Sequence, residues 1–455
     1  MTRTPAPAVL LALSLAGCRT AGPAIPVEGV VAGQRVRTTV DSESARDSVE
    51  KSLRGEGTID RAKLREIARK ESADLAALLF VEGLRENAAN RRAQESYLAH
   101  LEKLRRDPRR DWLVSAARGF EVLFAPGWFY RSDPESGADF RAQRELLDRL
   151  GIENALVETG ENDSVESNAE QLAAALRGRR GSGRPVILIS TSKSGPEVAL
   201  ALGDRLRPQE IAHVRAWVNV GGLLRGTPLA DAALRLPAGL IAGFALRGRL
   251  AGIASLRTRP RRARLENLQI PPAILILNYV AVPFSGGVTP GARSRYRRLV
   301  RHGPNDGLTL LADVVAAGGV TVVEPGLDHF FAAPDILERG LALLATVFSE
   351  LDRERSVYCE GGDDQHFPSP RRTGRDVSHR LRRAGGRHIT APCERSYRGG
   401  ALYASTGRRR SSLDSRDRRL SLFDTRGRGR PGLRRLLQRL RPRARPAHRS
   451  RPVDL

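Results

Sequence analysis

Between residues 118 and 352 the chain alternates short, almost continuously apolar runs with longer amphipathic segments. The apolar runs have the length of strands: FEVLFAP (120–126), ALVETG (155–160), PVILIS (185–190), AWVNVG (216–221), AILILNYVAV (273–282) and VTVVEP (320–325). Helices are predicted at about 139–150, 164–177, 194–206, 306–317 and 332–352. Strands that are apolar on both faces and alternate with helices favour a mostly parallel sheet covered by helices on both sides. We therefore expect an α/β domain over residues 113–352.

Two segments stand apart from this alternation. Residues 46–112 carry apolar side chains at three- and four-residue spacing with charges between them, which predicts helices. We expect these helices to pack on the α/β domain, with a partner-binding arm as the alternative. Residues 223–270 interrupt the alternation with an Arg-, Ala-, Gly- and Leu-rich insertion, which we expect to act as a cap or lid.

The N-terminus has the pattern of an export signal. Residues 1–18 combine Arg3, an apolar run too short to span a bilayer and a small-residue cleavage region. The ending Leu-Ala-Gly-Cys resembles the lipobox of bacterial lipoproteins, which implies diacylation of Cys18 and attachment to a membrane of the cell envelope. An ordinary signal peptide with an incidental cysteine is the alternative. Residues 19–45 are rich in Ala, Gly, Pro, Thr and Ser and are expected to form a flexible tether.

The charge of the chain is concentrated at its C-terminal end. The formal net charge is +25, but residues 356–455 hold 26 Arg, no Lys and nine Asp+Glu, which leaves only +8 for residues 1–355. Three interpretations of the segment 353–455 remain open: a disordered extension, a polyanion-binding arm, or sequence translated from a shifted reading frame. Since the excess charge lies outside the α/β domain, no nucleic-acid partner is expected for that domain.

The strongest chemical signal lies in VILISTSKSGPEVALAL (186–202), where an apolar strand leads through a serine-rich turn into a helix. Ser192 has small residues two positions before and after it, Ser190 and Ser194. This arrangement resembles the nucleophile elbow of the α/β-hydrolase family, in which a strained turn exposes the nucleophile. Serine replaces the usual glycine at both flanks. An ordinary serine-rich loop in another α/β protein is the alternative.

The resemblance implies a histidine and an acid that follow the nucleophile in the chain. His329 lies in VEPGLDHFF, directly after the last predicted strand, where the family carries its catalytic histidine. Asp306 lies in the turn Pro-Asn-Asp-Gly after the strand that ends near 282 and is the preferred acid, although a helix-capping role is the alternative. Asp328 is the second candidate for the acid.

Acyl transfer also needs hydrogen-bond donors where negative charge develops on the carbonyl oxygen. By the resemblance, one donor is the backbone N–H of Lys193 and the other is the N–H of Trp128, with Phe129 as second choice, in the loop FAPGWFYR (124–131). Together with Tyr130 these aromatic residues are expected to line an acyl pocket. Placement in the core or at the surface is the alternative.

Together these motifs imply a lipid-anchored serine esterase or lipase of the α/β-hydrolase fold, acting on an ester or lipid-like substrate through an acyl-enzyme. No cofactor is required by this chemistry, and no Cys/His spacing resembles a metal site. The alternative is a non-catalytic envelope lipoprotein that uses the same fold as a binding scaffold.

Overall fold

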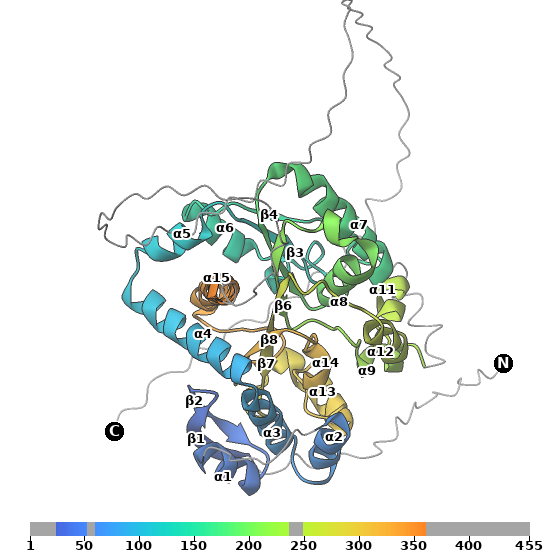
Figure 1. Cartoon of the computed structure of the whole chain (residues 1–455). Helices are drawn as coiled ribbons and strands as arrows, with labels where there is room; N and C mark the ends of the chain where they lie inside the picture. The colour runs from blue at the N-terminus through green and yellow to red at the C-terminus, as the bar shows by residue number, and fades with distance from the viewer. Residues whose placement is uncertain (1–23, 52–59, 236–248, 361–455) are drawn as a thin grey trace, which may run out of the picture. The chain divides into compact units, whose positions relative to one another are not determined.

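The computed structural model describes residues 24–51, 60–235 and 249–360 (Figure 1). Six parallel strands form the central sheet in the order β4-β3-β5-β6-β7-β8. Their bounds are β3 Glu121–Ala125, β4 Asn154–Leu156, β5 Val186–Thr191, β6 Val214–Val220, β7 Leu275–Val282 and β8 Val320–Pro325. This parallel, helix-covered sheet confirms the predicted α/β class, and its strand order is consistent with the α/β-hydrolase fold that the sequence resembles.

Helices cover both faces of the sheet, as Figure 1 shows. One face of the sheet is covered by α4, α5, α6 and α15, and the other face is covered by α7 and α8. The bounds are α4 Ala88–Arg106, α5 Asp111–Ala117, α6 Arg141–Arg149, α7 Val165–Arg179, α8 Ser194–Leu200 and α15 Ile336–Glu360. The side chains alternate between these two layers along each strand, so that Leu123 packs with α7 and α8 while Phe124 packs with α6 and α15.

The segment 46–112 forms helices in its described part, as predicted. They are α1 Glu43–Lys51, α2 Arg61–Lys70, α3 Ala73–Glu86 and α4. Helix α4 lies along the edge strand β8, where Asn90 accepts from Thr321 N–H and Gln94 accepts from Val323 N–H, at 2.8 and 2.9 Å. Because an unpaired strand edge invites aggregation, these side chains protect the open edge of the sheet.

The expected tether 19–45 is wrong for most of its length. Strands β1 (Ile25–Val31) and β2 (Gln34–Val40) form an antiparallel hairpin whose turn residues Ala32 and Gly33 both have positive φ. Buried valines of the hairpin pack into one cluster with α3 and the ends of β7 and β8. This apolar contact, rather than local composition, orders the segment. Residues 1–23, which include the predicted signal peptide and Cys18, lie outside the described residues.

Other predicted boundaries also change. The helix expected at 306–317 shrinks to α14 (Leu311–Val314), and the last helix continues beyond 352 to Glu360. The insertion 223–270 contains α9 (Pro228–Ala233), α11 (Leu250–Ser255) and α12 (Thr258–Glu266), and α13 (Pro290–Leu299) follows β7. Residues 236–248 and the basic tail from 361 lie outside the described residues. Within the described part, no helix is long and apolar enough to cross a bilayer.

Candidate active site

Ser192 occupies the sharp turn between the end of β5 and the start of α8. Its φ of 54° lies in the left-handed region, which a residue with a side chain adopts only under strain. The start of α8 can pack closely against Gly222 only because residue 195 is a glycine: a Cβ at this position would lie 2.6 Å from the Cα of Gly222. The strained turn lifts the Ser192 hydroxyl out of the end of the sheet.

The two serines that replace glycine beside the nucleophile have structural partners. Ser194 Oγ donates to the carbonyl oxygen of Ala125 at 2.8 Å, which fastens the elbow to the neighbouring strand β3. Ser190 Oγ accepts from the indole N–H of Trp217 at 2.8 Å. Both serines are fully buried. Their hydroxyl groups are therefore satisfied within the protein, and the departure from glycine leaves the elbow intact.

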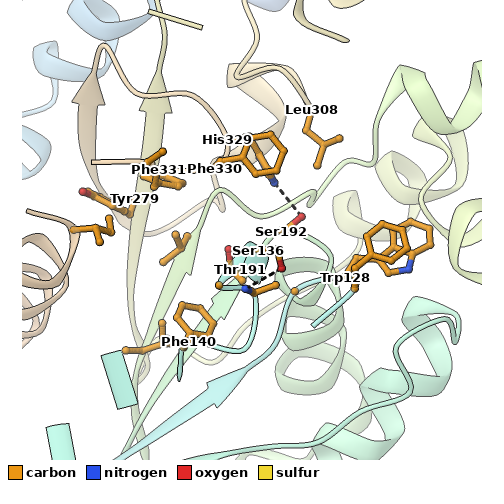
Figure 2. Close-up of a pocket in the computed structure, with 18 of the residues that line it drawn as sticks. Trp128, Ser136, Phe140, Thr191, Ser192, Tyr279, Leu308, His329, Phe330 and Phe331 are labelled. Carbon is orange, nitrogen blue, oxygen red and sulfur yellow. Dashed lines mark hydrogen bonds between the residues drawn. The ribbon is translucent and has the colours of Figure 1, made fainter. Parts of the chain in front are cut away.

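The imidazole of His329 lies between Ser192 and Asp306, and Figure 2 shows its side toward Ser192. Nε2 of His329 is 3.0 Å from Ser192 Oγ, and Nδ1 is 2.8 Å from Asp306 Oδ2. His329 N–H also donates to the backbone carbonyl oxygen of Asp306 at 2.8 Å. The structure thus brings together three residues from three separate loops, as the sequence predicts. With Asp306 accepting from Nδ1–H, the lone pair of Nε2 faces the serine.

The carboxylate of Asp306 is fixed by its own loop. Its Oδ1 accepts the N–H groups of Leu308 at 2.8 Å and Thr309 at 2.7 Å, and the side chain is buried. Asp306 therefore closes a turn ahead of α14 and does not cap that helix. The second candidate, Asp328, points elsewhere, since its Oδ2 accepts from both the N–H and the hydroxyl of Thr289.

The two predicted oxyanion donors lie on segments that pass beside each other. A Cβ on Gly127 would lie 3.1 Å from Thr191 Cγ2, so the loop that carries Trp128 runs directly against the elbow. Among the described residues, the N–H groups of Lys193 and Trp128 have no backbone acceptor. Phe129, the second choice, has a φ of 64°. Because neither N–H group has a backbone partner, both remain candidates for stabilising an oxyanion.

One feature that was not predicted from the sequence is the position of the Lys193 side chain. Its Nζ lies 2.5 Å from Glu197 Oε1, and both side chains are buried directly behind the nucleophile. Asn168 also donates to Glu197 Oε1 at 2.8 Å, and Lys193 Nζ lies 6.0 Å from the ring centre of Trp128. The spacing of four residues on a helix was the available signal. This buried pair links the two segments that carry the predicted oxyanion donors.

The Glu197 carboxyl should make stability pH-dependent. Burial raises its pKa from the ordinary 4.5 to about 7, with Lys193 opposing the shift. In that window the folded protein keeps a proton that the unfolded chain releases, so stability falls as pH rises. We expect the wild type to lose about 1 to 3 kcal/mol between pH 4.5 and 8 relative to Glu197→Gln, as measured by urea unfolding. A constant difference between the two proteins would mean that folding does not shift the pKa of this carboxyl.

A cavity of about 1160 Å³ opens onto Ser192 and His329. It is lined mostly by apolar side chains of the sheet, α6, α15 and the insertion, and Figure 2 shows part of this lining. Trp128 and Phe129 contribute to the lining as predicted. Tyr130 does not: it is buried and donates to the carbonyl oxygen of Thr159 at 2.7 Å. Helices α9 and α11 of the insertion 223–270 border the cavity, which is the place expected of a cap.

Within the described residues, no group of three or more His, Cys, Asp or Glu side chains could hold a metal ion.

No protein-family model matches this chain, and no curated protein sequence matches it either. Among solved structures, a metagenomic carboxyl esterase is 24% identical with a TM-score of 0.44, covering 52% of this chain and 76% of the other. The mature form of a Bacillus licheniformis lipase is 22% identical with a TM-score of 0.41, covering 51% and 91%. Phospholipase PlaB from Legionella pneumophila is 15% identical with a TM-score of 0.29, covering 43% and 46%. The activity of this chain has to be inferred from its own site.

Proposed function

We propose that this protein is a serine hydrolase that cleaves carboxylic esters through Ser192, His329 and Asp306. The observation that supports the proposal is the continuous hydrogen-bonded chain from the Ser192 hydroxyl through both imidazole nitrogens to the Asp306 carboxylate. A serine hydroxyl is a poor nucleophile unless a base takes its proton. The imidazole of His329, oriented by Asp306, is such a base. The turn at Ser192 exposes the hydroxyl to the cavity.

The reaction follows from these positions. His329 Nε2 takes the Ser192 proton as Oγ attacks the ester carbonyl carbon, and Asp306 holds the imidazole in the required tautomer and stabilises its positive charge. The N–H groups of Lys193 and Trp128 hold the oxyanion, with about 3 to 4 kcal/mol of stabilisation for each well-placed donor. His329 then returns the proton to the leaving alcohol. Water, activated by the same imidazole, hydrolyses the acyl-enzyme.

Labelling with a fluorophosphonate probe tests for an activated serine. We expect the wild-type protein to be labelled and Ser192→Ala to remain unlabelled, because the probe reacts only with a serine whose proton can be removed. The alternative function, a binding scaffold without catalysis, predicts no label on either protein. Loss of labelling in His329→Ala, with an unchanged melting temperature, would separate loss of the base from loss of the fold.

We further propose that Cys18 anchors the protein to an envelope membrane through covalently attached lipid. The support is the sequence alone: a short apolar run followed by Leu-Ala-Gly-Cys. Because two acyl chains give lasting attachment, the mature protein should remain with the membrane in high salt. Metabolic labelling with radioactive palmitate in a bacterial host should mark the wild type and spare Cys18→Ser. Equal labelling of both proteins, or of neither, would contradict the anchor.

A further inference from the structure

The cavity extends from Ser192 in two directions. One part, here called the inner arm, lies between the face of the sheet and the helices α6 and α15. Its lining comprises Phe124, Phe140, Gln143, Leu146, Leu147, Ile189, Val218, Tyr279, Phe331, Ile336, Leu337, Gly340, Leu341 and Leu344. The other part, here called the outer arm, runs toward the insertion and solvent. Figure 2 shows Phe140 and Tyr279 of the inner arm on one side of Ser192 and Trp128 of the outer arm on the other.

The inner arm is a gap in a core that is otherwise tightly packed. Ile189 lies on the central strand β5, yet its side chain is only partly buried, in contrast to the fully buried Ile187 two residues earlier on the same face. Ile336 and Leu337 at the start of α15 are also only partly buried while packing against the same cluster. Since protein interiors are normally close-packed, an apolar gap that opens onto a nucleophile has room for a guest.

The outer arm differs from the inner arm in its charge. Arg249 and Arg295 line the cavity there, with their guanidinium groups 4.9 Å from the ring centre of Phe129 and 5.4 Å from that of Phe330. The cavity lining outside the inner arm also includes the acidic residues Asp133 and Glu135. The side chain of Phe330 is 48% exposed, so this arm borders solvent. Two polar groups belong to the lining of the inner arm, the Gln143 amide and the Tyr279 hydroxyl. The Tyr279 hydroxyl is hydrogen-bonded to the hydroxyl of Tyr97 at 3.2 Å, and the other side chains of this lining are apolar. Only an apolar group would gain by entering the inner arm.

We propose that the inner arm binds the acyl chain of the ester, and that the substrate is therefore an ester of a long, unbranched fatty acid. The leaving alcohol then lies in the outer arm beside the two arginines. This assignment rests on the proposed serine hydrolase function. It moves the acyl pocket away from the aromatic loop 128–130, where the sequence predicted it. The whole cavity, at about 1160 Å³, exceeds the roughly 300 to 1,000 Å³ usual for small-molecule sites, and the many apolar side chains that line the inner arm suit an alkyl chain rather than an acetyl group.

Gly340 offers a way to shorten the inner arm without disturbing its walls. It lies in α15 and lines the cavity, and a Cβ at this position would meet only Gln143 Cγ at 3.8 Å, an ordinary contact. The helix backbone accepts a Cβ there, since glycine is not required by a positive φ. A phenylalanine at 340 should therefore occupy the arm instead of unfolding the protein.

The test compares p-nitrophenyl esters with acetyl, butyryl, octanoyl and dodecanoyl groups. For the wild type, kcat/KM should rise with acyl length by up to about fourfold per methylene until the arm is filled. Gly340→Phe should lower the ratio of kcat/KM on the dodecanoyl ester to kcat/KM on the acetyl ester at least about 100-fold relative to the wild type. Gly340→Ala should retain the preference for long chains. Gly83→Phe is the matched control, because Gly83 is also a helical glycine, a Cβ added to it would meet no atom within 4 Å, and it does not line the cavity.

Different results overturn different claims. If Gly340→Phe leaves the length preference unchanged, or if it acts on acetate esters of long alcohols instead, the acyl assignment is wrong while the hydrolase function stands. If the wild type is neither labelled by fluorophosphonate nor active on any ester, the hydrolase function itself fails. Binding of a fluorescent fatty acid to Ser192→Ala, and its loss in the double variant with Gly340→Phe, tests the arm without any turnover.

Discussion

Replacing Ser192 with alanine should lower kcat on a p-nitrophenyl ester by about 10⁴- to 10⁶-fold. In the proposed mechanism this hydroxyl forms the acyl-enzyme, and no other described serine is hydrogen-bonded to His329. The neighbouring serines cannot replace it, because Ser190 and Ser194 are buried and already bonded to Trp217 and Ala125. Residual activity should reflect only the binding of substrate and the oxyanion donors.

Replacing Ser192 with glycine should increase the stability of the protein even though it removes the hydroxyl. Ser192 has a φ of 54°, which costs a residue with a side chain of order 1 kcal/mol or more, whereas glycine adopts it freely. Ser192→Gly should therefore raise the free energy of unfolding by about 1 kcal/mol while being as inactive as Ser192→Ala. Urea unfolding and ester hydrolysis measured on the same preparations give both values. If either variant kept more than about a hundredth of wild-type kcat, Ser192 would not be the nucleophile.

The elbow could be predicted from sequence because its constraints are local. A strand, a nucleophile with small flanking residues and a helix follow one another within a single stretch, and each imposes a steric demand that can be read position by position. The order of Ser192, Asp306 and His329 along the chain then indicated the candidates for the acid and the histidine. What the sequence did not show is why serine is tolerated at the flanks. The answer depends on Ala125 and Trp217, which come from neighbouring strands.

The hairpin at 25–40 could not be predicted from composition because its order depends on distant residues. The segment 19–45 as a whole has the Ala, Gly, Pro, Thr and Ser content typical of a linker, but Val27, Val31, Val36 and Val40 are buried against other parts of the fold. The protection of β8 by Asn90 and Gln94 has the same character, since it joins positions more than 200 residues apart. Periodicity reports which face of an element is apolar, and not which partner covers it.

The buried Lys193–Glu197 pair shows a different limit. Its spacing is visible in the sequence, but a charged pair at this spacing on a helix is usually an exposed one of small energetic effect. Here the packing of α7 and the Trp128 loop over the elbow buries both charges. Burial, which the sequence does not show, turns a common surface pair into part of the support of the site.

Exchanging Asp306 for asparagine should lower kcat by about 10⁴-fold near neutral pH while leaving the fold in place. Asparagine Oδ1 can still accept the N–H groups of Leu308 and Thr309, so the turn is kept. The amide then presents its NH₂ group to His329 Nδ1, where the carboxylate oxygen stood at 2.8 Å. Since Nδ1 must accept that hydrogen bond, the ring carries its proton on Nε2 and has no lone pair for the Ser192 proton.

Asp328→Asn is the matched control, because it is adjacent to His329 in the chain and was the second candidate for the acid. The carboxylate of Asp328 accepts hydrogen bonds from Thr289 and from the N–H of Phe330. The Asp328→Asn substitution should therefore lower the stability by about 1 to 2 kcal/mol and lower kcat by less than about tenfold. The decisive measurement is the ratio of the two kcat values on one ester, with melting temperatures for both variants. If Asp328→Asn proved the more damaging to kcat, the carboxylate that orients His329 would have to be reassigned to Asp328. The loop of Asp306 would then have only a structural role, despite its direct hydrogen bond to the imidazole.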